Sequence, residues 1–237
     1  GVSGIITLPA SLTNIGNDAF RTTLYPFVLT FEPNSQLMTI GSFAFYNSNP
    51  TVNKGLSGSI TLPASLTRIE ESAFRQCFNV TSVEFESNSQ LDTIGNDAFN
   101  WMGVSGSITL PKSVTRIGDT AFYKCSSLTS VNFHELNQLE TIGISAFHLS
   151  GLSGSITLPA SLTSIGARAF FDATALTTVI IEMGSQLTSK GGDVFGSSGL
   201  SSFTAPQSVL DLFGVSVGIN KTVGGKDGVV VILPQII

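Results

Sequence analysis

Charge is scarce in this chain of 237 residues. Only 11% of the residues are Asp, Glu, Lys or Arg, where soluble domains usually have about a quarter. The formal net charge is −5, so the basic stripe with which proteins neutralise nucleic-acid phosphates is missing. No apolar run reaches the roughly 18 to 20 residues that span a bilayer. Gly1 is not followed by the basic and apolar regions of a signal peptide.

These shortages exclude nucleic acid as a partner and exclude membrane insertion. They also predict a surface built mostly from Ser, Thr, Asn and Gly, because 42% of the residues are hydrophobic and most of these are needed for a core. Such a weakly charged surface is typical of extracellular or cell-surface proteins. We expect any signal peptide to be absent from these residues.

What the chain has in abundance is repetition, which must be identified before any other feature of the fold. Successive copies of an Ala-Phe dipeptide are 23 to 29 residues apart. The aligned phenylalanines are Phe20, Phe45, Phe74, Phe99, Phe122, Phe147 and Phe170, and Val194-Phe195 takes the place of an eighth copy. The unit is about 24 residues long, and two alternating versions of it make a super-repeat twice that long. The one long step indicates an insertion between Tyr46 and Lys54.

Only one version of the unit contains the sequence SGSITLP, which begins at Ser57, Ser105 and Ser153. Within it, and at the same place in the other version, apolar and polar residues alternate, as in Ile108-Thr109-Leu110. This alternation predicts a short strand with one buried face. A second segment, Leu66 to Phe74 in one unit, should direct Leu66, Ile69, Ala73 and Phe74 inward. Glycines such as Gly143 in this segment are expected where the backbone turns sharply.

One unit cannot bury its apolar face alone, but stacked units can. We therefore predict an α/β solenoid of the leucine-rich-repeat type, with about ten coils. A parallel β-sheet should line one face, and short helical turns or loops should line the other. Residues 1–206 should form the repeats, and residues 207–237 a degenerate last coil and strand of the same domain. Strands are expected near residues 5–8, 28–31, 59–62, 82–85, 107–110, 130–133, 155–158, 178–181, 202–205 and 229–233.

The pattern resembles the BspA-like, or Treponema-type, leucine-rich repeat family. The matching segments include Leu128 to Phe133 and Ser113 to Cys125, and the resemblance covers about residues 4 to 206. It implies secreted or surface proteins that bind host proteins, matrix or other cells. No catalytic residues come with the resemblance.

The only two cysteines, Cys77 and Cys125, hold the same place in units two apart. Two coils are separated by roughly 9.6 Å, whereas a disulfide needs Cα atoms within about 6.8 Å. We expect two buried free thiols.

Nothing in the chain indicates a cofactor. His134-Glu135 follows a strand, but Glu86 and Glu182 lie two coils away on either side, too far to share a metal ion at about 2.0–2.2 Å. Gly224 to Gly228 fails as a phosphate loop because Asp227 stands where Ser or Thr belongs. Asn79 and Asn220 begin glycosylation sequons, which matter only in a secreted eukaryotic protein.

The outward strand positions form a row of small polar residues: Thr61, Glu84, Thr109, Asn132 and Thr157. One interpretation is purely structural, because Thr favours strands and its hydroxyl groups stack well in parallel sheets. A second is a recognition surface for a protein or glycan, and a third is an ice-binding face, although Glu84, Asn132 and Ile180 interrupt the Thr array. We choose these five residues as the candidate binding site.

We predict a non-enzymatic recognition or adhesion protein that binds through its strand-lined face. The alternative is self-assembly: the chain begins in mid-pattern and ends in an apolar strand, Val229 to Ile237, so two open ends could stack head to tail into a filament or surface layer.

Overall fold

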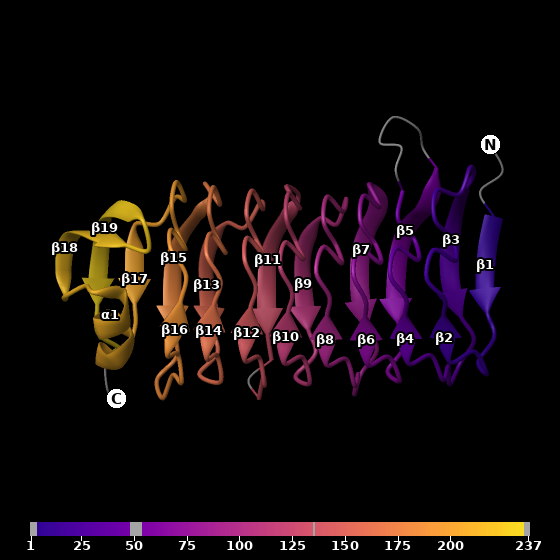
Figure 1. Ribbon diagram of the computed structural model, residues 1–237, viewed down its shortest axis with the longest axis horizontal. Coiled ribbons are helices and arrows are strands. Elements are labelled where there is room, and N and C mark those ends of the chain that lie inside the picture. Colours follow the sequence, from indigo (N-terminus) through magenta and orange to yellow (C-terminus); the bar gives the residue numbers. More distant parts are fainter. Residues whose placement is uncertain (1–3, 48–53, 135, 235–237) are drawn as a thin grey trace.

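The computed structural model describes residues 4–47, 54–134 and 136–234, and it shows a solenoid built almost wholly of parallel strands (Figure 1). The long strands are β1 (Gly4–Leu8), β3 (Pro26–Phe31), β5 (Gly55–Leu62), β7 (Asn79–Phe85), β9 (Gly106–Leu110), β11 (Leu128–Phe133), β13 (Gly154–Leu158), β15 (Leu176–Ile181), β17 (Ser202–Thr204) and β19 (Lys226–Ile232). The short strands are β2 (Asn14–Ile15), β4 (Thr39–Ile40), β6 (Arg68–Ile69), β8 (Thr93–Ile94), β10 (Arg116–Ile117), β12 (Thr141–Ile142), β14 (Ser164–Ile165) and β16 (Ser189–Lys190).

The solenoid has about eight turns, because eight turns carry both a long and a short strand. In the described residues, β17 and β19 extend the row of long strands without short strands of their own. Ten coils are therefore not confirmed, although a long strand lies at each of the ten expected positions. The expected insertion falls largely on residues 48–53, outside the described residues.

The face expected to carry short helical turns carries a ladder of hydrogen bonds between coils. In one coil the amides of Thr120, Phe122 and Lys124 donate to carbonyls of the next coil at 2.8–2.9 Å. Thr120 and Lys124 have positive φ angles of 52° and 56°. Left-handed residues spaced in this way turn the alternate amides along the solenoid axis, which a continuous helix does not do. Of the expected helical turns or loops, the helical turns are not confirmed, and within the described ranges the one helix is α1 (Gln207–Phe213).

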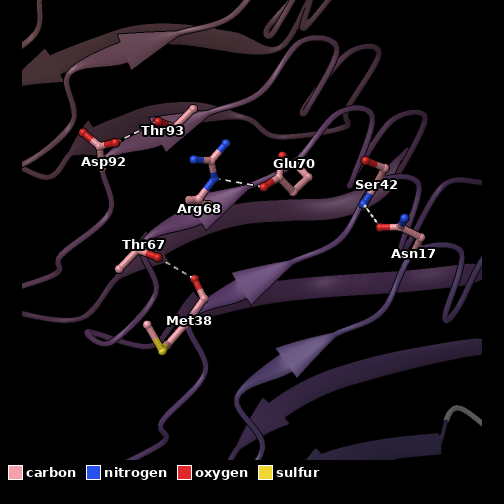
Figure 2. Close-up of polar contacts among 8 residues, drawn as sticks. All are labelled: Asn17, Met38, Ser42, Thr67, Arg68, Glu70, Asp92 and Thr93. Atoms are coloured by element: carbon pink, nitrogen blue, oxygen red, sulfur yellow. Dashed lines mark hydrogen bonds and ion pairs between the residues drawn. The ribbon is translucent and has the colours of Figure 1, made fainter.

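Side chains on the short-strand side add further bonds between coils (Figure 2). Thr67 Oγ1 donates to the Met38 carbonyl of the preceding coil at 2.9 Å, and the Ser42 amide donates to Asn17 Oδ1 at 2.9 Å. The same surface carries the ion pair between Arg68 and Glu70. Since the short strands form one unbroken sheet of eight strands, this side of the solenoid holds the coils at a uniform spacing.

The long strands, in contrast, do not form the single sheet that was expected. They divide into β1-β3-β5-β7, β9-β11 and β13-β15-β17-β19-β18. Figure 1 shows wider intervals between β7 and β9 and between β11 and β13. The SGSITLP strands have a left-handed glycine near their start, at Gly58, Gly106 and Gly154, with φ of 66–80°. At these glycines the register with the following strand shifts by one residue, so the repeated motif encodes a β-bulge.

The core is a column of phenylalanine rings, as the repeat predicts. From Phe20 to Phe195, successive ring centroids lie 5.1–5.6 Å apart with interplanar angles of 2–25°. The rings from Phe74 to Phe195 are completely buried, as are Leu66, Ile69 and Ala73. Offset stacking of this kind adds to the gain from burial.

A column of glycines follows the short strands, but not for the reason that the sequence suggested. Gly143 does not have a positive φ, so no sharp turn requires it. A Cβ atom there would lie 2.5 Å from the Asp119 amide nitrogen of the preceding coil. The column is therefore glycine because adjacent coils approach closely at this point.

The C-terminal end of the stack is covered. Phe213 of α1 packs on Phe195, with ring centroids 6.1 Å apart, and Val209 and Leu210 of the same helix are also buried. The apolar strand β19 lies between β17 and an antiparallel edge strand, β18 (Gly218–Val223). The apolar strand β19 is thus paired on both sides, and among the residues up to 234 the open edge of the sheet at this end belongs to β18. No helix in the described ranges is long and apolar enough to cross a membrane.

Cys77 and Cys125 are free and buried, as predicted. Each thiol donates to a backbone carbonyl of the preceding coil, Cys77 Sγ to Phe45 O at 3.2 Å and Cys125 Sγ to Phe99 O at 3.0 Å. Burial raises the pKa of Cys125 to about 12 and raises the pKa of Cys77 as well.

Truncating the middle of the ring column should destabilise the fold strongly. Phe122→Ala leaves a cavity between two stacked rings, so it should lower the free energy of unfolding by about 3–5 kcal/mol. Phe20→Ala is the matched control, because Phe20 ends the column and is only partly buried. Chemical denaturation measures both values, and equal losses would contradict the ring column as the main source of stability.

The glycine column gives a second prediction, which compares two glycine-to-alanine variants. Gly143→Ala should cost roughly 1–3 kcal/mol because the new methyl group presses on the backbone of the preceding coil. Gly16→Ala should be nearly neutral, because Gly16 holds the same place in the first turn and a Cβ atom there would meet no neighbouring atom within 4 Å. Thermal melting of the two variants compares them, and an equal effect would refute the close-approach explanation.

The thiols should react only after unfolding. Because burial disfavours the thiolate, which is the reactive form, native protein should resist alkylation. Under denaturing, non-reducing conditions, mass spectrometry should find two labels. Finding none would indicate a disulfide between Cys77 and Cys125 and would show that the coil register is wrong.

Candidate functional site

The five predicted site residues all lie on the exposed side of the long strands, but the breaks in the sheet separate them. Thr61 pairs with Glu84, Thr109 pairs with Asn132, and Thr157 pairs with Ile180. Glu84 and Thr109 lie on the two sides of the break between β7 and β9. The row is therefore divided into separate strand pairs, the last of which joins Thr157 to the apolar Ile180, and it is not one even lattice.

A groove of about 640 Å³ opens at the break between β7 and β9. One wall is residues 83–89, which include the predicted Glu84 and the partly buried Phe85. The other wall contains the predicted Thr109 together with Ser107 and Lys112, and His134 of the next coil also lines the groove. Carboxylates thus lie on the β7 wall and donors on the β9 wall.

A hydrogen bond that recurs between paired coils is missing at this groove and at no other such pair of the described coils. In three coil pairs, a glutamate after the second long strand accepts a hydrogen bond from an alanine amide after the first. The pairs are Ala10 with Glu32 at 2.9 Å, Ala64 with Glu86 at 2.9 Å, and Ala160 with Glu182 at 3.0 Å. In the fourth pair, β9 and β11, Lys112 stands at the alanine position and His134 at the glutamate position.

His134 makes a different contact from the glutamates that it replaces. Its Nδ1 accepts a hydrogen bond from the Leu136 amide at 3.2 Å, so the neutral imidazole carries its proton on Nε2 and offers a donor there. Glu135, which was considered with His134 as a metal ligand, lies outside the described residues. Among the residues that are described, no group of three His, Cys, Asp or Glu side chains is placed to hold a metal ion.

A smaller hollow of about 320 Å³ lies on the turn side, lined by Trp101, Lys124, Ser126 and Leu149. Trp101 is partly exposed, which suggests a platform for a ligand, but the chain already contacts the indole. Lys124 Nζ lies 4.4 Å from the ring centroid, and Phe78 makes an edge contact at 6.1 Å. This hollow is accordingly a weaker candidate than the groove.

Lys112, His134 and the three sister glutamates were not among the residues predicted from sequence as a site. The signal is nevertheless present in the aligned repeats. Ala10, Ala64 and Ala160 share one column with Lys112, and Glu32, Glu86 and Glu182 share another with His134. Both aligned positions depart from the repeat in the same coil pair, β9 and β11.

At one of the two glycosylation sequons, Asn79 is partly buried and its Nδ2 donates to the Lys54 carbonyl at 3.0 Å, so this amide already has a structural role.

Comparison with protein families gives one match that spans most of the chain. The model for the BspA type leucine rich repeat region matches in six copies, over residues 4–105, 53–153 and 92–213. A search of curated proteins yields no match.

Solved structures similar to this chain come from bacteria. A leucine-rich repeat protein from Bacteroides ovatus is 22% identical, with a TM-score of 0.43, over 98% of this chain and 66% of its own. The pneumococcal vaccine antigen PcpA is 21% identical, with a TM-score of 0.53, over 84% of this chain and 61% of its own. The leucine-rich repeat protein of T. pallidum is 22% identical, with a TM-score of 0.46, over 89% of this chain and 88% of its own. The chain thus spans less than two thirds of the length of the first two, and at this identity the likeness to PcpA supports the fold alone.

Proposed function

The chain belongs to the BspA-type leucine-rich repeat family, and on that premise we propose that it recognises a protein or glycan ligand at a cell surface or in the extracellular matrix. Recognition takes place on the long-strand face, with the groove between β7 and β9 at its centre. The role is binding and not catalysis, and it needs no cofactor. The single observation that carries the proposal is the groove itself, which contains two of the residues chosen from sequence, Glu84 and Thr109.

The groove suits recognition for two physical reasons. Its walls are strands fixed by a fully buried ring column, so binding requires little ordering of the protein. Its polar groups are carboxylates on one wall and donors on the other, so the ligand is oriented as well as held. The weakly charged surface, with 11% charged residues, favours an extracellular or cell-surface location.

The two alternatives have less support. End-to-end assembly would continue the parallel pattern of the repeat, whereas the edge strand at the C-terminal end, β18, runs antiparallel to β19. Ice binding requires a regular array of hydroxyl groups, whereas the long-strand face is divided into three sheets and is interrupted by Glu84, Asn132 and Ile180.

The proposal predicts that the face can be disabled without loss of the fold. Labelled chain is applied to a panel of immobilised extracellular matrix proteins and to a glycan array. Glu84→Ala combined with Asn132→Ala should weaken binding to whatever the wild-type chain retains by roughly tenfold or more, as for residues central to an interface. Both side chains are exposed, so the melting temperature should not change.

The matched control is Arg116→Ala combined with Glu140→Ala, two exposed residues on the short-strand side. This variant should bind like the wild type. If the control loses binding and the Glu84/Asn132 variant retains it, recognition occurs on the other side of the solenoid and the proposal is wrong.

A further inference from the structure

The repeated hydrogen bond from an alanine amide to a glutamate carboxylate shows which chemical group binds at this position of the coil. Three times along the solenoid, a carboxylate oxygen lies 2.9–3.0 Å from the backbone nitrogen that follows the Leu-Pro end of a long strand. The carboxylate comes from an extended segment, because the glutamate directly follows the strand residue Phe31, Phe85 or Ile181. The position is therefore built to receive a carboxylate from a neighbouring strand.

At the fourth position none of the described residues supplies such a carboxylate. The Lys112 amide, which corresponds to the three alanine amides, has no hydrogen-bond partner within the described part of the chain. The replacement also reverses the local charge. A neutral alanine has become a lysine, and an anionic glutamate has become a histidine that offers Nε2–H as a donor. The Lys112 amide, the Lys112 ammonium group and the His134 imidazole are thus all donors.

We propose that Lys112 and His134 form a binding site for a single carboxylate of a partner protein, an Asp or Glu side chain carried on an extended segment. The partner's carboxylate takes the place that Glu32, Glu86 and Glu182 occupy in the other coil pairs. The site lies at the end of the groove, since both residues line it. This inference rests on the proposed function and specifies the ligand for it.

Two observations favour an extended polypeptide over an acidic glycan. First, the three sister carboxylates come from residues at the end of a β-strand, so the position fits a side chain on an extended backbone. Second, β7 and β9 belong to different sheets, so their backbone groups beside Glu84 and Thr109 are not paired with each other and can accept single hydrogen bonds from a ligand backbone.

The opposite wall limits the charge of the segment. Glu84 and Glu86 both line the groove, so a run of acidic residues would be repelled there. The ligand segment is expected to have one carboxylate near Lys112 and His134, with neutral or basic residues elsewhere. General attraction of polyanions to Lys112 would not show this preference.

The test uses a displayed library of random peptides, selected on the wild-type chain and counter-selected on a reverted variant. The reverted variant, Lys112→Ala with His134→Glu, restores the pair found in the three sister positions. It should melt at or above the wild-type temperature because it regains the repeated hydrogen bond. Peptides specific for the wild type should share one Asp or Glu within a stretch of β-branched residues.

A selected peptide, labelled with fluorescein, is then titrated by anisotropy. Changing its acidic residue to the amide should weaken binding roughly tenfold or more, the value of a hydrogen bond to a charged group. The reverted variant should show the same loss, and so should Lys112→Ala alone. As a matched control, Ala160→Lys with Glu182→His copies the donors into the last coil pair and should leave binding of the peptide to the Lys112 site unchanged.

Three results would overturn the inference. The first is that the selected peptides need no carboxylate, and the second is that the reverted variant binds them equally well. The third is that a hyaluronan oligosaccharide binds in a manner that depends on Lys112 and His134 while no peptide does, which would assign the site to a glycan. If the inference fails but a matrix protein or glycan is still bound through Glu84 and Asn132, the proposed function stands; if that binding is also absent, both fail.

Discussion

The contact on which the structure depends is the stacking of one coil on the next. Successive phenylalanine rings are 5.1–5.6 Å apart, whereas paired strands prefer about 4.8 Å. The two spacings cannot be met by every part of a coil at once. The short strands keep an unbroken ladder of eight, the glycine column lets the backbones approach there, and the long strands separate into three sheets. The groove lies at one of the two places where the long strands separate.

Repetition and departure from repetition have different roles in this chain. The repeated residues build the solenoid: the rings fill its axis, and the left-handed glycines of SGSITLP set the bulges. Departures at exposed positions do not affect the stack, so they are free to carry specificity. Lys112 and His134 depart together, in one coil pair, at a position where the repeat otherwise closes a contact within the chain. That coincidence distinguishes the groove between β7 and β9 from the similar break between β11 and β13.

The sequence predicted those features that follow from period and polarity. Phe122 and its equivalents recur at a fixed place, so a buried column was foreseeable, and the distance between Cys77 and Cys125 excluded a disulfide. Features that depend on backbone conformation were not foreseeable. The side chains of Thr120 and Lys124 do not indicate a left-handed φ, so the sequence left helical turns and loops as open alternatives on this face. The break between β7 and β9 separates two strands that both show the alternating pattern, so that pattern did not reveal it, and the role of Glu86 depends on its partner Ala64. The helix α1 follows the repeats, where the sequence shows no periodic pattern, so neither the helix nor its contact with Phe195 could be predicted.

The division of the long-strand face is the claim on which the groove and both proposals rest, and residue-resolved amide hydrogen exchange by NMR tests it most directly. In a strand with neighbours on both sides, such as β15, all amides should be protected alike. In β9, which pairs only with β11, the alternate amides that point toward β7 should exchange much faster than those that point toward β11. Uniform protection along β9 would show that the sheet is continuous, and it would contradict the groove.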